Sequence, residues 1–167
     1  MFRSLEGSFQ SPVKETNPVP VFWPMGGIGG NLTLSAAVIE GRPFILFEKF
    51  TVEGIVDAIK RHALTSIALT PTMLRMIYDA NVPAEDLSSL IAFFGGSGPL
   101  DPAMQDKVEE RYGKPVIWAL GATEFCGTAI AWTLDLHREF SRTKRGSAGR
   151  PLSGCHVRIT DPDSGEP

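Results

Sequence analysis

The amino-acid sequence predicts an α/β fold in which a mostly parallel β-sheet is flanked by helices. Short runs rich in β-branched and aromatic residues alternate with longer amphipathic stretches, which is typical of βαβ units. The four clearest runs start at positions 43, 66, 90 and 115, so that consecutive starts are 23 to 25 residues apart. This spacing leaves room for the crossover helix that two parallel strands need.

The expected strands are short and apolar. They cover residues 43–47 (PFILF), 66–69 (SIAL), 90–94 (LIAFF) and 115–119 (PVIWA). Each run is bounded by residues that favour turns or helix starts, which supports a strand of four or five residues rather than part of a longer helix.

The stretches between these strands carry helix start signals. Thr51 can cap a helix whose apolar residues recur at helical spacing along residues 52–59. Thr70-Pro71 and Asp101-Pro102 each place a capping side chain before a first-turn proline, and Gly113 is suited to end the second of these helices. An earlier helix is expected at about residues 32–39.

The two ends of the chain show less periodicity. A further strand is expected at residues 128–134, an exposed charged loop at 135–150, and a last strand at 155–160. The sequence therefore predicts three regions: a tail or loop at 1–20, an α/β nucleotide-binding subdomain at 21–134, and at 135–167 an exposed loop with the start of a truncated β subdomain.

Composition limits the classes of partner. The chain has 167 residues, with 16 Lys and Arg against 19 Asp and Glu, and its pI is near 5.6. It has no clustered basic patch, so nucleic acid is not an expected partner. The longest uncharged run, residues 16–39, is interrupted by prolines and glycines, so we expect no transmembrane helix. With two cysteines in no repeated spacing, the chain is expected to be cytoplasmic.

Two loops carry the candidate chemistry. The strand at 90–94 leads into a glycine-rich loop, and the strand at 115–119 leads into Leu120, Gly121, Ala122, Thr123 and Glu124. Parallel strands deliver their following loops to one sheet edge, where ligands of open α/β sheets bind. Glycines allow backbone to approach a ring or a phosphate, while a hydroxyl can donate to phosphate and a carboxylate can hold Mg²⁺.

Simpler readings of each feature stand beside this one. A glycine-rich segment is more often a turn, and an acidic residue such as Glu124 is favoured in any first helical turn. The glycines at 26–30 do not complete a dinucleotide fingerprint, and the chain has no Gly-Lys-Ser/Thr phosphate loop. Cys126 has no visible histidine partner for nucleophilic catalysis, and no set of metal ligands at a characteristic spacing occurs.

Five motifs in order resemble the adenylate-forming (AMP-binding) enzymes, and most of all the acyl-CoA synthetases, including fatty-acid–CoA ligases. They are PMGGIGG at 24–30, TPTML at 70–74, GGSGPL at 95–100, GATE at 121–124 and GSAGRPL at 146–152. The resemblance runs from about residue 20 to the C-terminus but covers only the middle of the family's sequence. It implies one subdomain of the synthetase N-terminal domain.

The resemblance implies an ATP-dependent ligase that activates a carboxylic acid, fatty or aryl, as an acyl-adenylate and transfers the acyl group to coenzyme A. Implied nucleotide contacts are Gly96, Ser97, Gly98, Pro99, Leu120, Gly121, Ala122 and Thr123. Thr123 and Glu124 are the implied catalytic residues, with Thr123 on the α-phosphate and Glu124 ligating Mg²⁺. Gly27, Gly29 and Gly30 are implied to border the acyl site.

Departures from the family pattern lead us to expect that the isolated chain is inactive. Leu120 stands where a tyrosine usually stacks on adenine, and Gly27 stands where histidine or an aromatic residue is usual. The family's phosphate loop, ribose-binding aspartate and C-terminal lysine are not found in this sequence, so the isolated chain is expected to be inactive and to need a complementary synthetase fragment. The alternative is a non-catalytic nucleotide-binding or interaction module with the same loops.

Overall fold

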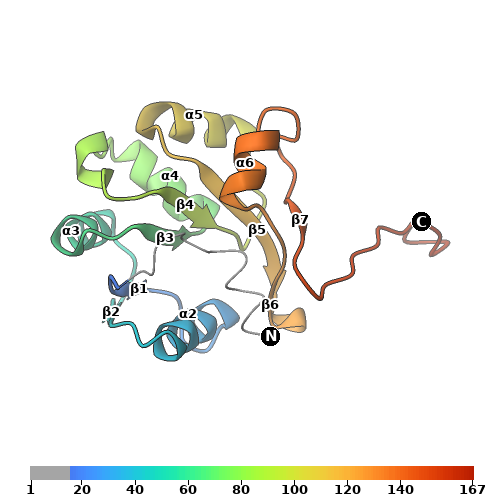
Figure 1. Cartoon of the computed structure of the whole chain (residues 1–167), viewed down its shortest axis with the longest axis horizontal. Coiled ribbons are helices and arrows are strands. Elements are labelled where there is room, and N and C mark those ends of the chain that lie inside the picture. The colour runs from blue at the N-terminus through green and yellow to red at the C-terminus, as the bar shows by residue number, and fades with distance from the viewer. Residues whose placement is uncertain (1–15) are drawn as a thin grey trace.

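The computed structural model describes residues 16–167 and confirms the α/β class (Figure 1). Two sheets are present in this part of the chain. The first 15 residues of the expected tail lie outside the described residues.

The larger sheet has five strands in the order β3-β4-β5-β6-β7. Its parallel half contains β3 (Ser66–Leu69), β4 (Ala92–Gly95) and β5 (Val116–Ala122). Its antiparallel half adds β6 (Gly127–Ala131) and β7 (Arg150–Pro151). Three of the expected strands are therefore neighbours as the spacing predicts, and β4 and β5 deliver their following residues to the same sheet edge.

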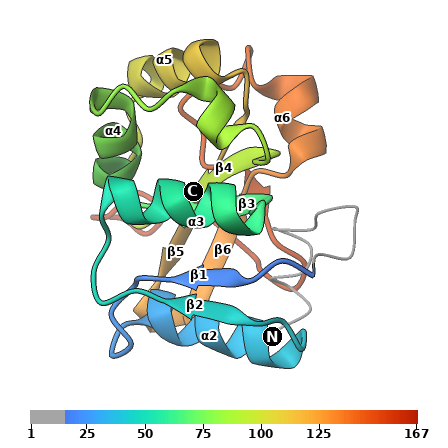
Figure 2. The same ribbon diagram turned by 90° about the vertical axis from the view of Figure 1, so that its left-hand side faces the viewer.

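The fourth expected strand lies elsewhere. β2 (Phe44–Leu46) pairs in parallel with β1 (Val19–Val21), and these two strands form a separate sheet. β1 occupies residues that the sequence assigned to a tail or to the start of the subdomain, because three residues containing a proline give no periodic signal. Figure 2 shows this small sheet between α3 (Val52–His62) and α2 (Ile28–Ile39).

The helix starts follow the predicted capping chemistry. The Thr51 hydroxyl accepts a hydrogen bond from the Gly54 N–H at the start of α3, and Thr70 accepts from Met73 at the start of α4 (Pro71–Asp79). Asp101 caps α5 (Pro102–Tyr112) in the same way. The chain leaves α5 at Gly113, which has a φ of 61°. α2 starts four residues earlier than expected.

From the end of β5 onward, the observed secondary structure differs most from the sequence-based prediction. The strand β5 continues to Ala122, so Leu120, Gly121 and Ala122 belong to a strand rather than to a loop. A one-turn 3₁₀ helix, η2 (Thr123–Phe125), joins β5 to β6. The strand expected at 128–134 ends at Ala131, and α6 (Leu134–Phe140), which Thr133 caps by accepting from Leu136 N–H, takes up the first part of the exposed loop expected at 135–150. The strand expected at 155–160 is wrong, because this exposed segment has no strand partner among the described residues and runs away from the packed body (Figure 1).

One main apolar core lies between the parallel strands and the helices. A further short 3₁₀ helix, η1 (Ala84–Leu87), closes this core beside α3. The fully buried large side chains of this core include Phe93, Ile55, Ile59, Leu64, Ile67, Leu69, Leu74, Ile77, Leu87, Leu90 and Ile117. Among residues 16–167, no helix has both the length and the apolar character needed to cross a membrane.

Candidate functional site

The glycine loop begins where β4 ends. A Cβ atom added at Gly95 would lie 2.3 Å from the Trp118 ring and 2.4 Å from the Leu69 carbonyl oxygen, so only glycine fits between β3 and β5 here. Ser97 has a φ of 64°, which makes the loop turn sharply before it reaches α5. The loop from Gly96 to Pro99 is thus fixed at its root and exposed at Ser97 and Pro99.

The second element is the hairpin formed by β5, η2 and β6. Gly95 pairs with Trp118, so β5 extends four residues beyond the end of β4 and carries Thr123 and Glu124 past the glycine loop. Gly121 allows the hairpin strands to approach, because a Cβ there would lie 2.6 Å from the Gly127 carbonyl oxygen.

Direct contacts join the glycine loop to β5. The Trp118 Nε1–H donates a hydrogen bond of 2.8 Å to the Gly98 carbonyl. A Cβ at Gly96 would lie 2.8 Å from the Ala119 carbonyl oxygen, so the two backbones nearly touch there. The loop and the hairpin therefore border one region of the sheet edge. Sequence reasoning missed Trp118 as the anchor of this loop, although a tryptophan within a strand, whose N–H needs an acceptor, was a usable signal.

The hairpin presents its polar groups to solvent. Thr123 and Glu124 are exposed, as are about half of the Leu120 and Phe125 side chains. Within residues 16–167, no cluster of three His, Cys, Asp or Glu side chains could hold a metal ion by itself. Mg²⁺ is commonly held by one or two carboxylates together with substrate phosphates, and the exposed Glu124 carboxylate fits that donor pattern.

The expected acyl-site glycines lie at the start of α2. Gly27 is the exposed N-cap residue of this helix. A Cβ at Gly30 would lie 2.4 Å from the Pro24 carbonyl oxygen, and one at Gly29 would lie 3.4 Å from the Trp23 ring. Gly30 thus has a packing reason to be glycine, and Gly29 lies against an aromatic wall.

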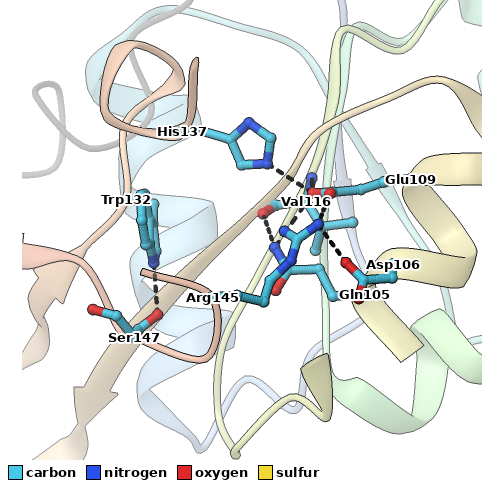
Figure 3. A network of polar contacts seen from close by, with 8 residues as sticks. All are labelled: Gln105, Asp106, Glu109, Val116, Trp132, His137, Arg145 and Ser147. Carbon is cyan, nitrogen blue, oxygen red and sulfur yellow. Dashed lines mark hydrogen bonds and ion pairs between the residues drawn. The ribbon is translucent and has the colours of Figure 1, made fainter. Parts of the chain in front are cut away.

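A polar cluster, which sequence reasoning also missed, joins α5 to α6 and the segment that follows it (Figure 3). Its centre is Glu109, which accepts hydrogen bonds from the Val116 N–H at 2.9 Å and from Arg145 Nη2 at 2.5 Å and contacts His137 Nε2 at 2.7 Å. Burial raises the pKa of Glu109, but the bonds from His137, Arg145 and Val116 outweigh it and hold the pKa at about 2. No local pattern marks this cluster, because its central partners Glu109 and Arg145 are 36 residues apart.

Parallel strands that bring a glycine loop and a Thr-Glu turn to one edge define a class of protein, the α/β domains that bind ligands at the carboxyl ends of their strands. Comparison with known proteins narrows this class. The family model described as AMP-binding enzyme matches residues 4–167. The chain belongs to the AMP-binding enzyme family.

Individual relatives agree with the family match. Over 138 residues the chain is 36% identical to 2-succinylbenzoate–CoA ligase from Bacillus pumilus, which covers 83% of this chain and 27% of the relative. It is 28% identical to 4-coumarate–CoA ligase 3 from Oryza sativa over 137 residues, 81% of this chain and 24% of the relative.

The fold agrees with a solved structure of the same family. O-succinylbenzoate coenzyme A synthetase from Bacillus subtilis, in complex with ATP and magnesium ion, superimposes with a TM-score of 0.77 at 27% identity, over 99% of this chain and 33% of that one. The chain thus spans about a quarter to a third of the length of these proteins.

Proposed function

We propose that this chain supplies part of the ATP·Mg²⁺ site of an acid–CoA ligase. Such an enzyme joins a carboxylate oxygen to the α-phosphorus of ATP with release of pyrophosphate, and the thiol of coenzyme A then takes the acyl group with release of AMP. The observation that carries the proposal is the shared sheet edge, where the Trp118 contact with Gly98 holds the glycine loop beside the strand that ends in Thr123 and Glu124. Family membership supports it.

The proposed roles follow from the position of each group. A nucleotide base can lie against the backbone of the glycine loop and of the last residues of β5, and it can bond to their N–H groups. The exposed Leu120 side chain adds an apolar contact. The nucleotide-contacting residues proposed are Gly96, Ser97, Gly98, Pro99, Leu120, Gly121, Ala122 and Thr123. The Thr123 hydroxyl would donate to the α-phosphate, and Glu124 would hold Mg²⁺ through its carboxylate. Mg²⁺ would neutralise charge on the phosphates as pyrophosphate leaves.

The proposed acid is aromatic. The relatives named above act, by their names, on 2-succinylbenzoate and 4-coumarate, and both acids carry a ring. Gly27, Gly29 and Gly30 are proposed to border the acyl site, since they bring backbone rather than bulky side chains to its wall. An aryl acid is preferred here over the fatty acid that the sequence resemblance also allowed.

Further polypeptide is proposed to complete the enzyme. The relatives are three to four times longer, and β2 exposes 47% of Phe44 and 65% of Leu46 where a covering segment would bury them. A cytoplasmic location is proposed as well, supported by free Cys126 and Cys155.

Calorimetry with ATP, with and without Mg²⁺, tests the proposal on the chain itself. Wild type is expected to bind ATP more tightly when Mg²⁺ is present, and Glu124→Gln is expected to lose this dependence. Glu110→Gln, which removes an exposed carboxylate from α5, is the matched control and should behave as wild type. Binding without pyrophosphate release from a panel of aryl acids is the expected result for the isolated chain. Indifference to ATP would contradict the proposed site.

A further inference from the structure

Arg145 links α5 to the segment that leads into β7. Its Nη2 contacts Asp106 Oδ1 and Glu109 Oε2, each at 2.5 Å, and both carboxylates belong to α5 (Figure 3). The Arg145 side chain is 24% exposed and that of Glu109 is 16% exposed, so solvent screens this pair less than it screens a surface ion pair, whereas Asp106 is 59% exposed and adds a weaker contact. Only four residues separate Arg145 from Arg150, where β7 begins.

On its other side the same segment is fastened to Trp132, the residue after β6, and lies against Ala131 at the end of β6. The Trp132 Nε1–H donates a hydrogen bond of 2.6 Å to the Ser147 carbonyl. Gly149, with a φ of 102°, lies so close to β6 that a Cβ there would be 2.2 Å from the Ala131 carbonyl carbon. Residues 145–149 are therefore held between α5 and β6, and they set where β7 can begin.

Strand pairing links β7 to the sheet edge that is proposed to bind the nucleotide. Pro151 pairs with Ile130, and Ile130 pairs with Leu120, so these residues form one row across three strands. Thr123 and Glu124 follow Leu120 by three and four residues on the same hairpin. A two-residue edge strand has few bonds of its own, and its position depends on the segment that precedes it.

We propose that Arg145 is a positioning residue: by tying residues 145–149 to α5 it fixes β7 against β6, and so steadies the β5–β6 hairpin that presents Thr123 and Glu124. This inference rests on the proposed function only in that it concerns the same site. Arg145 itself lies in the polar cluster, near the start of β5, and β5 runs from there for seven residues before Thr123. Its effect is therefore transmitted through the strands and not through contact with ligand.

The test compares Arg145→Gln with Arg145→Lys and with Arg138→Gln. Arg138 is a matched control because it is 76% exposed and pairs only with Asp135 among the described residues. Arg145→Lys keeps the positive charge, and the single Nζ of lysine can contact both the Asp106 and the Glu109 carboxylates, as Nη2 of Arg145 does. Amide hydrogen exchange is measured at Leu152, whose N–H bonds to the Ala129 carbonyl, at Leu120 and Ala122, and at α3 as a reference for global opening.

Arg145→Gln is expected to speed exchange at Leu152 and in the hairpin by about fivefold or more relative to α3, and to weaken Mg²⁺-dependent ATP binding by a similar factor. Arg145→Lys should recover much of both losses, and Arg138→Gln should match wild type. Equal acceleration in α3, unchanged exchange at Leu152, or unchanged ATP affinity alongside faster local exchange would each overturn the inference. If wild type binds no ATP, the proposed function of the chain fails, while the exchange comparison still decides whether Arg145 positions the hairpin.

Discussion

The ionised Glu109 carboxylate is expected to stabilise the fold, and Glu109→Gln tests this. Burial disfavours the charged form, but His137, Arg145 and the Val116 N–H favour it more, so the pKa lies at about 2 instead of 4.5. Glutamine keeps an oxygen for the Val116 N–H but loses the charge that Arg145 pairs with. The variant should therefore be less stable than wild type at neutral pH.

The magnitude follows from the size of that pKa shift. A fall from 4.5 to about 2 corresponds to about 3 kcal/mol of unfolding free energy at neutral pH, and partial solvent access reduces this to about 2 kcal/mol. Because the pKa is lowered in the folded state, the contribution is fully present above pH 4.5 and is lost as the pH falls toward 2. By pH 3 roughly 60% of it should be gone.

Urea unfolding of wild type and Glu109→Gln at pH 7, 5, 4 and 3 measures the difference directly. The difference in unfolding free energy should be constant between pH 7 and 5 and should shrink by more than half at pH 3. Glu110→Gln, on the exposed side of α5, should change stability by less than about 0.5 kcal/mol at neutral pH. A Glu109→Gln deficit that stays the same from pH 7 to pH 3 would refute the reasoning.

Two further substitutions probe the packing around the site and the helix starts. Gly95→Ala should destabilise the chain by about 3 kcal/mol or leave it insoluble, because its Cβ would overlap the Trp118 ring, whereas Gly26→Ala, with no atom within 4 Å of its Cβ, should be close to neutral in thermal unfolding. Thr51→Ala should cost about 1 kcal/mol, because the Gly54 N–H loses its acceptor, and Thr51→Ser should recover most of that loss in the same melts. A stable Gly95→Ala protein, or an unchanged Thr51→Ala melt, would contradict these two expectations.

Local chemistry made much of the fold predictable. Thr51, Thr70 and Asp101 act as caps because their side-chain oxygens lie next to amphipathic stretches, a signal confined to a few residues. The partner of β2 could not be predicted in this way, since strand pairing depends on contacts across the chain and the residues of β1 show no pattern of their own. α6 was missed because it is only seven residues long, with three of them (Asp135, Arg138 and Glu139) charged, and because Leu134 at its start was read as the end of a strand.

The approximate location of the candidate site could also be predicted, because it follows from the order of the parallel strands. Parallel neighbours bring their following residues to one edge, so placing the strands also placed Gly96 and Glu124 at that edge. The extension of β5 through Ala122 depends on pairing with β6, and the Trp118 bond to Gly98 joins residues 20 apart. Neither feature has a local sequence signal strong enough to specify it.

A nuclear magnetic resonance titration of the chain with ATP and Mg²⁺ tests the central claim most directly. If one nucleotide contacts both the glycine loop and the hairpin, the amide signals of Gly96 and Gly98 and those of Thr123 and Glu124 should shift together and saturate at one dissociation constant. Signals from α3 should stay in place. Shifts confined to one of the two elements, or saturating at different ATP concentrations, would contradict a single pocket shared by both.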